Sequence, residues 1–351
     1  MKNIAKQALL ILIAWCAVVL VVLIALEISL RVFTEPAITP GYTISHPDRR
    51  YVLRPGFKGW TYDKRVEVNS MGLREPEGPI STGDEAYRVI VLGDSVTFGR
   101  GVDLEETFPK ILERKLNGQA GKRVHIYNLG VESYNTVAEF RYLKDVFDRL
   151  KPHLVIFEFT AGNDTILTQL GLSVNQFAPI RWIKDILRNL YSYDWLASKF
   201  YSIIYRFYMP AQATGDSDQQ LIQRLSWDNA LFDESFQGWQ ECKQAFADIA
   251  QFGRAKSVPI IFALQVNNIK LTTKEKDDPW YPVVRKLREA LAEAGIEKVV
   301  LIDEAFRSYA GREQELWVRP QDSHFSVLAH ELTAELLYEK MTSFGWWPPK
   351  Q

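Results

Sequence analysis

The strongest constraint on the fold is a series of short, apolar, β-branched runs that alternates with helical periodicity from residue 86 onward. The runs cover residues 88–92, 124–129, 154–159, 258–264 and 299–302. Such runs are typical of strands buried on both faces of a parallel sheet. Helical spacing over 107–117, 136–150 and 327–341 accompanies them. This alternation predicts an α/β fold with a mainly parallel five-stranded sheet and right-handed crossovers.

The amino-terminal segment is apolar and carries no charge from Gln7 to Leu26. It is long enough to cross a bilayer as a helix. No small-residue cleavage pattern follows it, so we interpret residues 1–33 as a cytoplasmic tip and an uncleaved signal anchor. Lys2 and Lys6 precede the span and Arg31 follows it. If the nearest flanks count most, this charge bias favours a single-pass protein with a cytoplasmic amino terminus and an extracytoplasmic domain.

The remaining chain divides into a linking region, 34–86, and a larger domain, 87–346. Prolines and glycines over 34–56 predict an extended tether, and 57–86 a small, irregular or β-rich lead-in. Inside the domain, about 166–227 form an insertion that is too long for a usual connection. Its aromatic residues are interleaved with basic ones, which fits a substrate lid or an interfacial helix. Helices packed on the flank of the domain are the simpler interpretation.

Charge and cysteine content exclude several classes of function. The 42 basic and 43 acidic residues give a net charge of −1, which argues against a nucleic-acid partner. Two cysteines, Cys16 and Cys242, cannot form a disulfide framework, and we expect no thiol chemistry. The histidines lack the spacing of a zinc motif and the carboxylates do not form a calcium loop, so we expect no metal and no cofactor.

Polar residues and glycines follow three successive predicted strands. Gly93-Asp94-Ser95 ends the first, Gly130 follows the second, and Gly162-Asn163-Asp164 follows the third. Ligands bind at the carboxyl ends of strands in open α/β sheets, so Ser95 can be presented to a substrate there. The Gly130 amide and the Asn163 side chain are suitable donors to a developing oxyanion. Each block alone fits a turn or a helix cap, but their coincidence favours a site.

A serine nucleophile needs a base, because its hydroxyl is weak until an imidazole takes its proton. His324 follows the last strand and returns to the carboxyl edge of the sheet, and Asp322 can orient it. The other histidines lie elsewhere: His46 in the tether, His125 and His153 near strand starts, and His330 inside the last helix, where packing or capping is expected.

These blocks, in this order, resemble the SGNH (GDSL-type) hydrolases over about residues 86–345. The resemblance implies a flavodoxin-like three-layer α/β/α fold with Ser95 as nucleophile, His324 as base and Asp322 as its partner. It also implies an oxyanion hole made by the Ser95 amide, Gly130 and Asn163, supported by Gly93, Asp94 and Asp164. Residues 68–74, together with the anchor, resemble the membrane-tethered bacterial branch of the family.

One departure from the family pattern concerns the spacing of Asp322 and His324. Many members place the aspartate three residues before the histidine, whereas here it is two residues before. The shorter spacing is similar to SGNH-like proteins that acetylate exopolysaccharides. The leading interpretation is a serine esterase that hydrolyses or deacetylates an ester-bearing glycan or lipid at the cell envelope through an acyl-enzyme.

Two alternatives accompany this interpretation. One is an O-acetyltransferase that modifies an exopolysaccharide, in which a sugar hydroxyl replaces water. The other is a membrane-tethered glycan-binding protein with a lapsed site, since the ten tryptophans suit sugar stacking. The presence of Ser95, Asn163, Asp322 and His324 together argues against the lapsed site.

Overall fold

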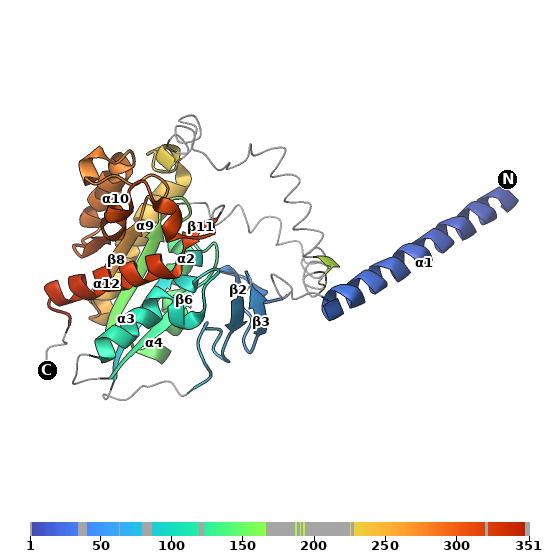
Figure 1. The fold of residues 1–351 in the computed structure, drawn as a ribbon, viewed down its shortest axis with the longest axis horizontal. Coiled ribbons are helices and arrows are strands. Elements are labelled where there is room, and N and C mark those ends of the chain that lie inside the picture. The colour runs from blue at the N-terminus through green and yellow to red at the C-terminus, as the bar shows by residue number, and fades with distance from the viewer. Residues whose placement is uncertain are drawn as a thin grey trace.

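The computed structural model describes residues 2–33, 41–62, 64–78, 86–118, 123–165, 187, 190, 192–193, 225, 228–319 and 322–347. Its centre is a five-stranded parallel sheet of order β6-β5-β7-β8-β9 (Figure 1). The strands are β5 (Ala86–Gly93), β6 (Arg123–Gly130), β7 (Leu154–Thr160), β8 (Ile260–Gln265) and β9 (Val299–Leu301). The predicted parallel sheet is confirmed. The strand order reverses between β5 and β7, which defines the topological switch point.

Helices cover both faces of the sheet because its inner strands, such as β5, are apolar on both faces. In β5, Ile90 and Leu92 belong to one hydrophobic core, whereas Val89 and Val91 belong to the other. The first core contains residues of α4 (Thr136–Leu150), α9 (Gln237–Lys256) and α10 (Tyr281–Glu293). The second contains residues of α3 (Phe108–Asn117) and α12 (Val327–Ser343). The expected three-layer α/β/α fold is therefore confirmed.

The short elements that link these layers are α2 (Ser95–Phe98), η1 (Leu104–Glu106), η2 (Glu275–Asp277), α11 (Asp303–Phe306), η3 (Arg307–Tyr309), η4 (Glu313–Leu316), β10 (Trp317–Arg319) and β11 (Asp322–Phe325). Two of them, α2 and β11, carry residues of the candidate site. Helix α2 starts directly after β5, and β10 pairs with β11 in an antiparallel hairpin just before α12.

The region before the domain is more structured than the predicted tether. β1 (Thr43–His46) pairs with β2 (Arg50–Leu53), so the expectation of an extended tether is wrong for the second half of 34–56. The hairpin forms because it buries Leu53 and packs Tyr51 against Tyr134, whose hydroxyl donates to the Tyr51 carbonyl at 2.5 Å. A second hairpin, β3 (Lys58–Thr61) with β4 (Lys64–Glu67), fits the predicted β-rich lead-in.

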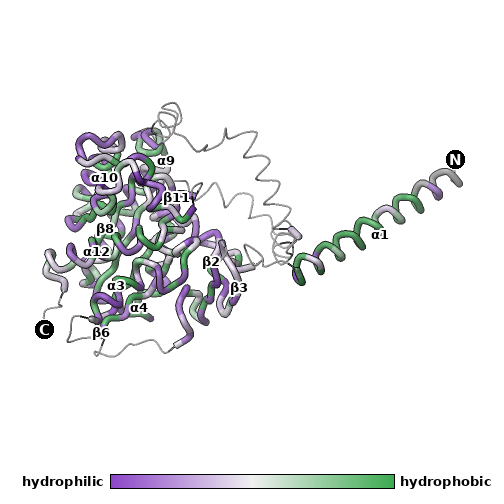
Figure 2. The backbone as a smooth tube through the Cα atoms, viewed as in Figure 1, coloured by the Kyte–Doolittle hydropathy of each residue, from purple (hydrophilic) through white to green (hydrophobic). Residues whose placement is uncertain are grey.

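Helix α1 (Lys2–Phe33) projects away from the domain (Figure 1). Its surface is apolar over most of its length (Figure 2), and the most apolar 18-residue stretch of the segment Leu9–Phe33 has a mean hydropathy of 3.3 with none of that stretch buried. This length and apolarity are those of a membrane-spanning helix or a signal sequence. The predicted aromatic insertion lies outside the described residues, apart from residues 187, 190, 192–193 and 225.

Candidate active site

Ser95 lies at the carboxyl edge of the sheet because the chain turns sharply from β5 into α2. A Cβ atom at Gly93 would lie 2.2 Å from Thr97 Oγ1 and 2.6 Å from Glu158 Oε2, so only glycine fits this turn. Asp94 then caps α2 by accepting a hydrogen bond from the Val96 amide at 2.8 Å. Together the close turn and the cap fix Ser95 as the first residue of the helix.

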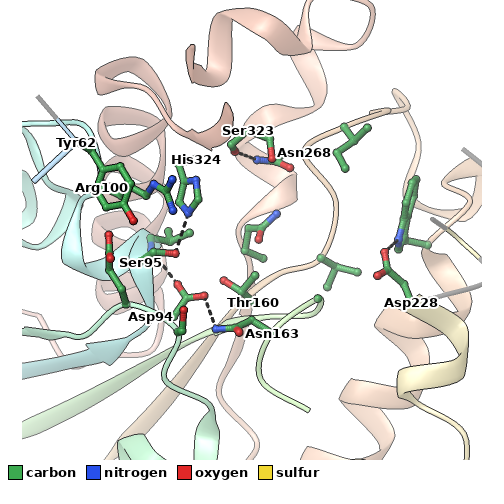
Figure 3. Close-up of a pocket in the computed structure, with 18 residues that line it drawn as sticks. Tyr62, Asp94, Ser95, Arg100, Thr160, Asn163, Asp228, Asn268, Ser323 and His324 are labelled. Atoms are coloured by element: carbon green, nitrogen blue, oxygen red, sulfur yellow. Dashed lines mark hydrogen bonds between the residues drawn. The ribbon is translucent and has the colours of Figure 1, made fainter. Parts of the chain in front are cut away.

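His324 lies directly beside Ser95 on the same wall of the cavity, with 2.8 Å between Nε2 and Oγ (Figure 3). Its Nδ1 is hydrogen-bonded to Oδ1 of Asp322. Both residues belong to strand β11, in which side chains two residues apart lie on the same face. This strand geometry explains how an aspartate two residues before the histidine reaches the imidazole.

Asp322 carries a negative charge at neutral pH. Burial raises the pKa of its carboxyl group, but the hydrogen bond and charge of His324, followed by the charge of Arg100, lower it to about 2. Arg100 Nε lies 3.6 Å from Asp322 Oδ2, and its guanidinium lies 3.6 Å from the centre of the Tyr62 ring. An ionised carboxylate in this position orients the imidazole and stabilises its protonated form.

Asn163 and Asp164 lie in the turn that follows β7. Asp164 holds this turn, because its Oδ2 accepts from the Thr160 amide at 2.7 Å and its Oδ1 from the Thr136 hydroxyl at 2.8 Å. The Nδ2 of Asn163 points toward Asp94 (Figure 3), donating to Asp94 Oδ2 at 2.9 Å and to the Tyr134 carbonyl at 2.8 Å. Both of its protons therefore have acceptors within the protein.

Gly130 does not reach the cavity, which corrects the expectation from the sequence. Its amide donates to Asn128 Oδ1 at 2.9 Å, and a Cβ there would lie 2.1 Å from the Phe98 amide nitrogen. Gly130 is thus required for the close packing of α2 on β6. The chain reaches the cavity at the next two turn residues after Val131, Glu132 and Ser133, and Ser133 is a non-glycine residue with φ of 58°.

The Ser133 amide is the second backbone donor at the site. Among the described residues neither it nor the Ser95 amide has a hydrogen-bond acceptor. Sequence reasoning missed Ser133 because Gly130, whose amide has no side chain in the way, was chosen as the donor after the second strand. The available signal was the position of Ser133 in the turn between the end of the strand and the helix that starts at Thr136.

The cavity encloses about 310 Å³ and is mainly polar. It is lined by Tyr62, Asp94, Ser95, Val96, Arg100, Glu132, Ser133, Thr160, Gly162, Asn163, Asp228, Gln265, Val266, Asn268, Ile269, Trp280, Ser323 and His324. Tyr62, Arg100 and Glu132 were not anticipated from the sequence, since they belong to no recognised motif, although Glu132 lies in the turn after β6. Asn268 secures the β10–β11 hairpin, because its Nδ2 donates to the Ser323 carbonyl at 2.6 Å.

Buried carboxyl groups form a layer beneath Ser95. Glu139, Glu158, Asp164 and Asp94 are all at most 3 % exposed. Burial and then the mutual repulsion of their charges raise the pKa values of Glu139, Glu158 and Asp164, which favours their protonated forms. Glu158 accepts hydrogen bonds from the Thr97 and Thr160 hydroxyls. Within the described part of the chain, no group of three or more His, Cys, Asp or Glu residues could hold a metal ion.

A parallel α/β sheet with a serine, histidine and aspartate in hydrogen-bonding order at its switch point is typical of serine-dependent hydrolases. Comparison of the sequence with family profiles identifies the family within this class of hydrolases. The chain belongs to the GDSL-like lipase/acylhydrolase family, whose sequence profile matches residues 91–332. None of the curated proteins compared with the chain matches it.

Solved structures to which the chain is similar include TesA, the psychrotrophic esterase EstA from Pseudoalteromonas sp. and the lipase/acylhydrolase from Enterococcus faecalis. TesA is 15% identical over 73% of this chain and 98% of its own, with a TM-score of 0.42. The corresponding values are 12%, 74%, 98% and 0.41 for EstA, and 14%, 75%, 98% and 0.40 for the Enterococcus protein.

Proposed function

We propose that the protein is a serine esterase that cleaves short acyl groups from a polar alcohol through an acyl-enzyme. The observation that carries this proposal is the 2.8 Å contact between Ser95 Oγ and His324 Nε2, with Asp322 behind the imidazole. Ser95 attacks the ester carbonyl while His324 takes its proton, and His324 then gives that proton to the leaving alcohol. Water attacks the acyl-enzyme in the same way and releases the acid.

The oxyanion of each tetrahedral intermediate is stabilised by the amides of Ser95 and Ser133, with Asn163 as a third donor. The support for the amides is that they border the cavity and have no acceptor among the described residues. Asn163 joins them by exchanging its hydrogen bond to the Tyr134 carbonyl or to Asp94. Hydrogen bonds of this kind commonly tighten only in the reacting complex.

The cavity favours a small acyl group on a polar alcohol. Its volume of about 310 Å³ and its many amide, hydroxyl and carboxyl groups fit a deacetylation better than the release of a long acyl chain. With α1 as a membrane anchor and the domain outside the cytoplasm, the substrate is an ester-bearing glycan or lipid of the cell envelope. Transfer of the acyl group to a sugar hydroxyl differs from hydrolysis only in the acceptor.

The test uses the full chain with p-nitrophenyl acetate and a fluorophosphonate probe. We expect Ser95→Ala to lower kcat/KM by at least about 10³-fold, because removal of a nucleophile leaves only binding and oxyanion stabilisation. Ser323→Ala is the matched control, since Ser323 also lines the cavity but lies between Asp322 and His324 in β11, so its side chain is on the other face of the strand. Full inhibition by the probe with recovery of unmodified Ser95 would contradict the proposal.

A further inference from the structure

Glu132 is a buried carboxyl group on the wall of the candidate active site. It is 7% exposed, lines the cavity and directly precedes Ser133. The Tyr42 hydroxyl donates to its Oε2 at 2.7 Å, and the Tyr51 hydroxyl donates to its backbone carbonyl at 2.5 Å. Tyr42 thus holds the carboxyl group, and Tyr51 holds the backbone that carries it. The other carboxyl oxygen, Oε1, is buried and has no partner within hydrogen-bond distance in the described part of the chain, and the Tyr62 hydroxyl is the polar group that interacts with the carboxyl group from the cavity side.

Arg100 supplies a donor on the same wall. Its guanidinium lies against the Tyr62 ring and between Tyr62 and His324 (Figure 3), with its Nε 3.6 Å from Asp322 Oδ2. The Nε atom is buried, and in the described structure the side chain donates no hydrogen bond. A buried polar atom without a partner costs about 1–3 kcal/mol, so two of them beside a reactive serine need an explanation.

We propose that Glu132 and Arg100 bind the hydroxyl groups of a sugar that forms the alcohol half of the ester. This inference rests on the proposed function and names its substrate class. A sugar hydroxyl both donates and accepts, so one hydroxyl satisfies Glu132 Oε1 while its neighbour satisfies the Arg100 guanidinium. The sugar thereby lies beside His324, which protonates the leaving oxygen. An aryl or simple alkyl alcohol would leave both groups unpaired.

The test compares two esters with the same acetyl group. One is p-nitrophenyl acetate, which has no hydroxyl on its alcohol, and the other is a monoacetylated methyl glucoside with its remaining hydroxyls free. We expect Glu132→Gln to lower kcat/KM for the sugar ester about 10- to 100-fold more than for p-nitrophenyl acetate, mainly through KM. Gln retains an oxygen for the Tyr42 hydroxyl, so the loop keeps its support. We expect Arg100→Met likewise to lower kcat/KM for the sugar ester more than kcat/KM for p-nitrophenyl acetate.

The outcomes separate this inference from the proposed function. If the wild-type protein neither cleaves p-nitrophenyl acetate nor reacts with a fluorophosphonate, the proposed function itself fails. If the wild type is active and both variants lose the two activities equally, Glu132 and Arg100 support the reacting groups only, and the sugar subsite is wrong. A ratio of kcat/KM between the two esters that is the same in the variants as in the wild type would also overturn the sugar subsite. A loss confined to glycerol monoacetate, tested as a third ester, would assign the pair to a glycerolipid instead.

Tyr42→Phe is the matched control for the position of the loop. It removes the hydrogen bond to Oε2 and leaves Oε1 in place. We expect it to affect both esters by similar factors, since it loosens Glu132 and Ser133 together. If Tyr42→Phe changes the ratio of kcat/KM between the two esters as much as Glu132→Gln does, loop support rather than contact with the sugar explains the effect.

Discussion

Individual histidines in this chain do different work because their surroundings differ. His324 is half-buried, contacts Ser95 and has a carboxylate behind it. His330 is 1% exposed in α12 and stacks against Phe108, whose amide donates to its Nδ1 at 3.2 Å. Burial lowers the pKa of His330 to about 3. The expected packing role of His330 is therefore confirmed by its position.

His330 makes the fold sensitive to acid. The unfolded chain binds the proton near pH 6.5, whereas the folded chain resists it down to about pH 3. The stability that neutral His330 provides is thus complete above pH 6.5 and is lost as the pH falls. Between pH 7 and pH 5 this loss amounts to about 2 kcal/mol. Between pH 7 and pH 5, we expect the free energy of unfolding of His330→Gln to fall by about 2 kcal/mol less than that of the wild type, measured by urea titration at both pH values. Parallel decreases in both proteins would contradict this.

Site residues that belong to recognisable sequence blocks could be predicted, and residues outside such blocks could not. Ser95 and Asn163 line the cavity because each follows a strand of the parallel sheet, and β11 holds Asp322 and His324 beside Ser95. Gly130 was wrongly predicted to donate to the oxyanion. A glycine is required at this position because α2 packs closely against it, and packing of this kind has no signature in a single sequence. Tyr62, Arg100 and Glu132 reach the site through long-range contacts, which no local pattern encodes.

At the scale of elements, the sheet protects its edge strand with side chains. The outward backbone groups of β6 are bonded by residues from α3 and the lead-in. Asn117 bonds both backbone groups of Val124, and Lys110 donates to the Ile126 carbonyl at 2.9 Å. Glu75 accepts from the Asn128 amide at 2.9 Å. Because an unpaired edge is a template for association, this arrangement keeps β6 from pairing with another chain.

Lys110 and Glu75 form a buried ion pair in this arrangement, with 2.7 Å between Nζ and Oε2 and both side chains at most 5% exposed. Removal of one partner leaves the other charge buried. We expect Lys110→Met to destabilise the fold by about 3–5 kcal/mol, and the added change Glu75→Gln to recover part of the loss. Urea titration measures both.

The control for this pair is Lys115→Met on the same helix. Lys115 pairs with Glu335 at the surface, where both side chains are more than a third exposed. Its loss should cost at most about 1 kcal/mol. Equal effects of the substitutions at Lys110 and Lys115 would show that the buried pair has no special role in covering the edge.

For the whole molecule, the region after α1 joins the candidate site to the membrane-proximal end of the chain. Tyr42 and Tyr51 contact Glu132, and Tyr62 lies under Arg100, so the lead-in contributes directly to the cavity wall. Between Phe33 and Gly41 the chain can span at most about 30 Å. If α1 crosses a membrane, the first hairpin therefore stays within that distance of the surface, which suits a substrate of the cell envelope.

The anchor leads to a prediction about the mature protein. We expect the chain to keep its full mass of 40.4 kDa, to remain in membranes during alkaline carbonate washing, and to require detergent for release. The apolar part of α1 is the physical reason, since residues 9–26 carry no charge and their transfer to water is unfavourable. Protease added outside intact spheroplasts should digest the domain and spare an amino-terminal tag. A soluble product that begins after residue 33 would instead identify α1 as a cleaved signal sequence, and protection of the domain would reverse the topology.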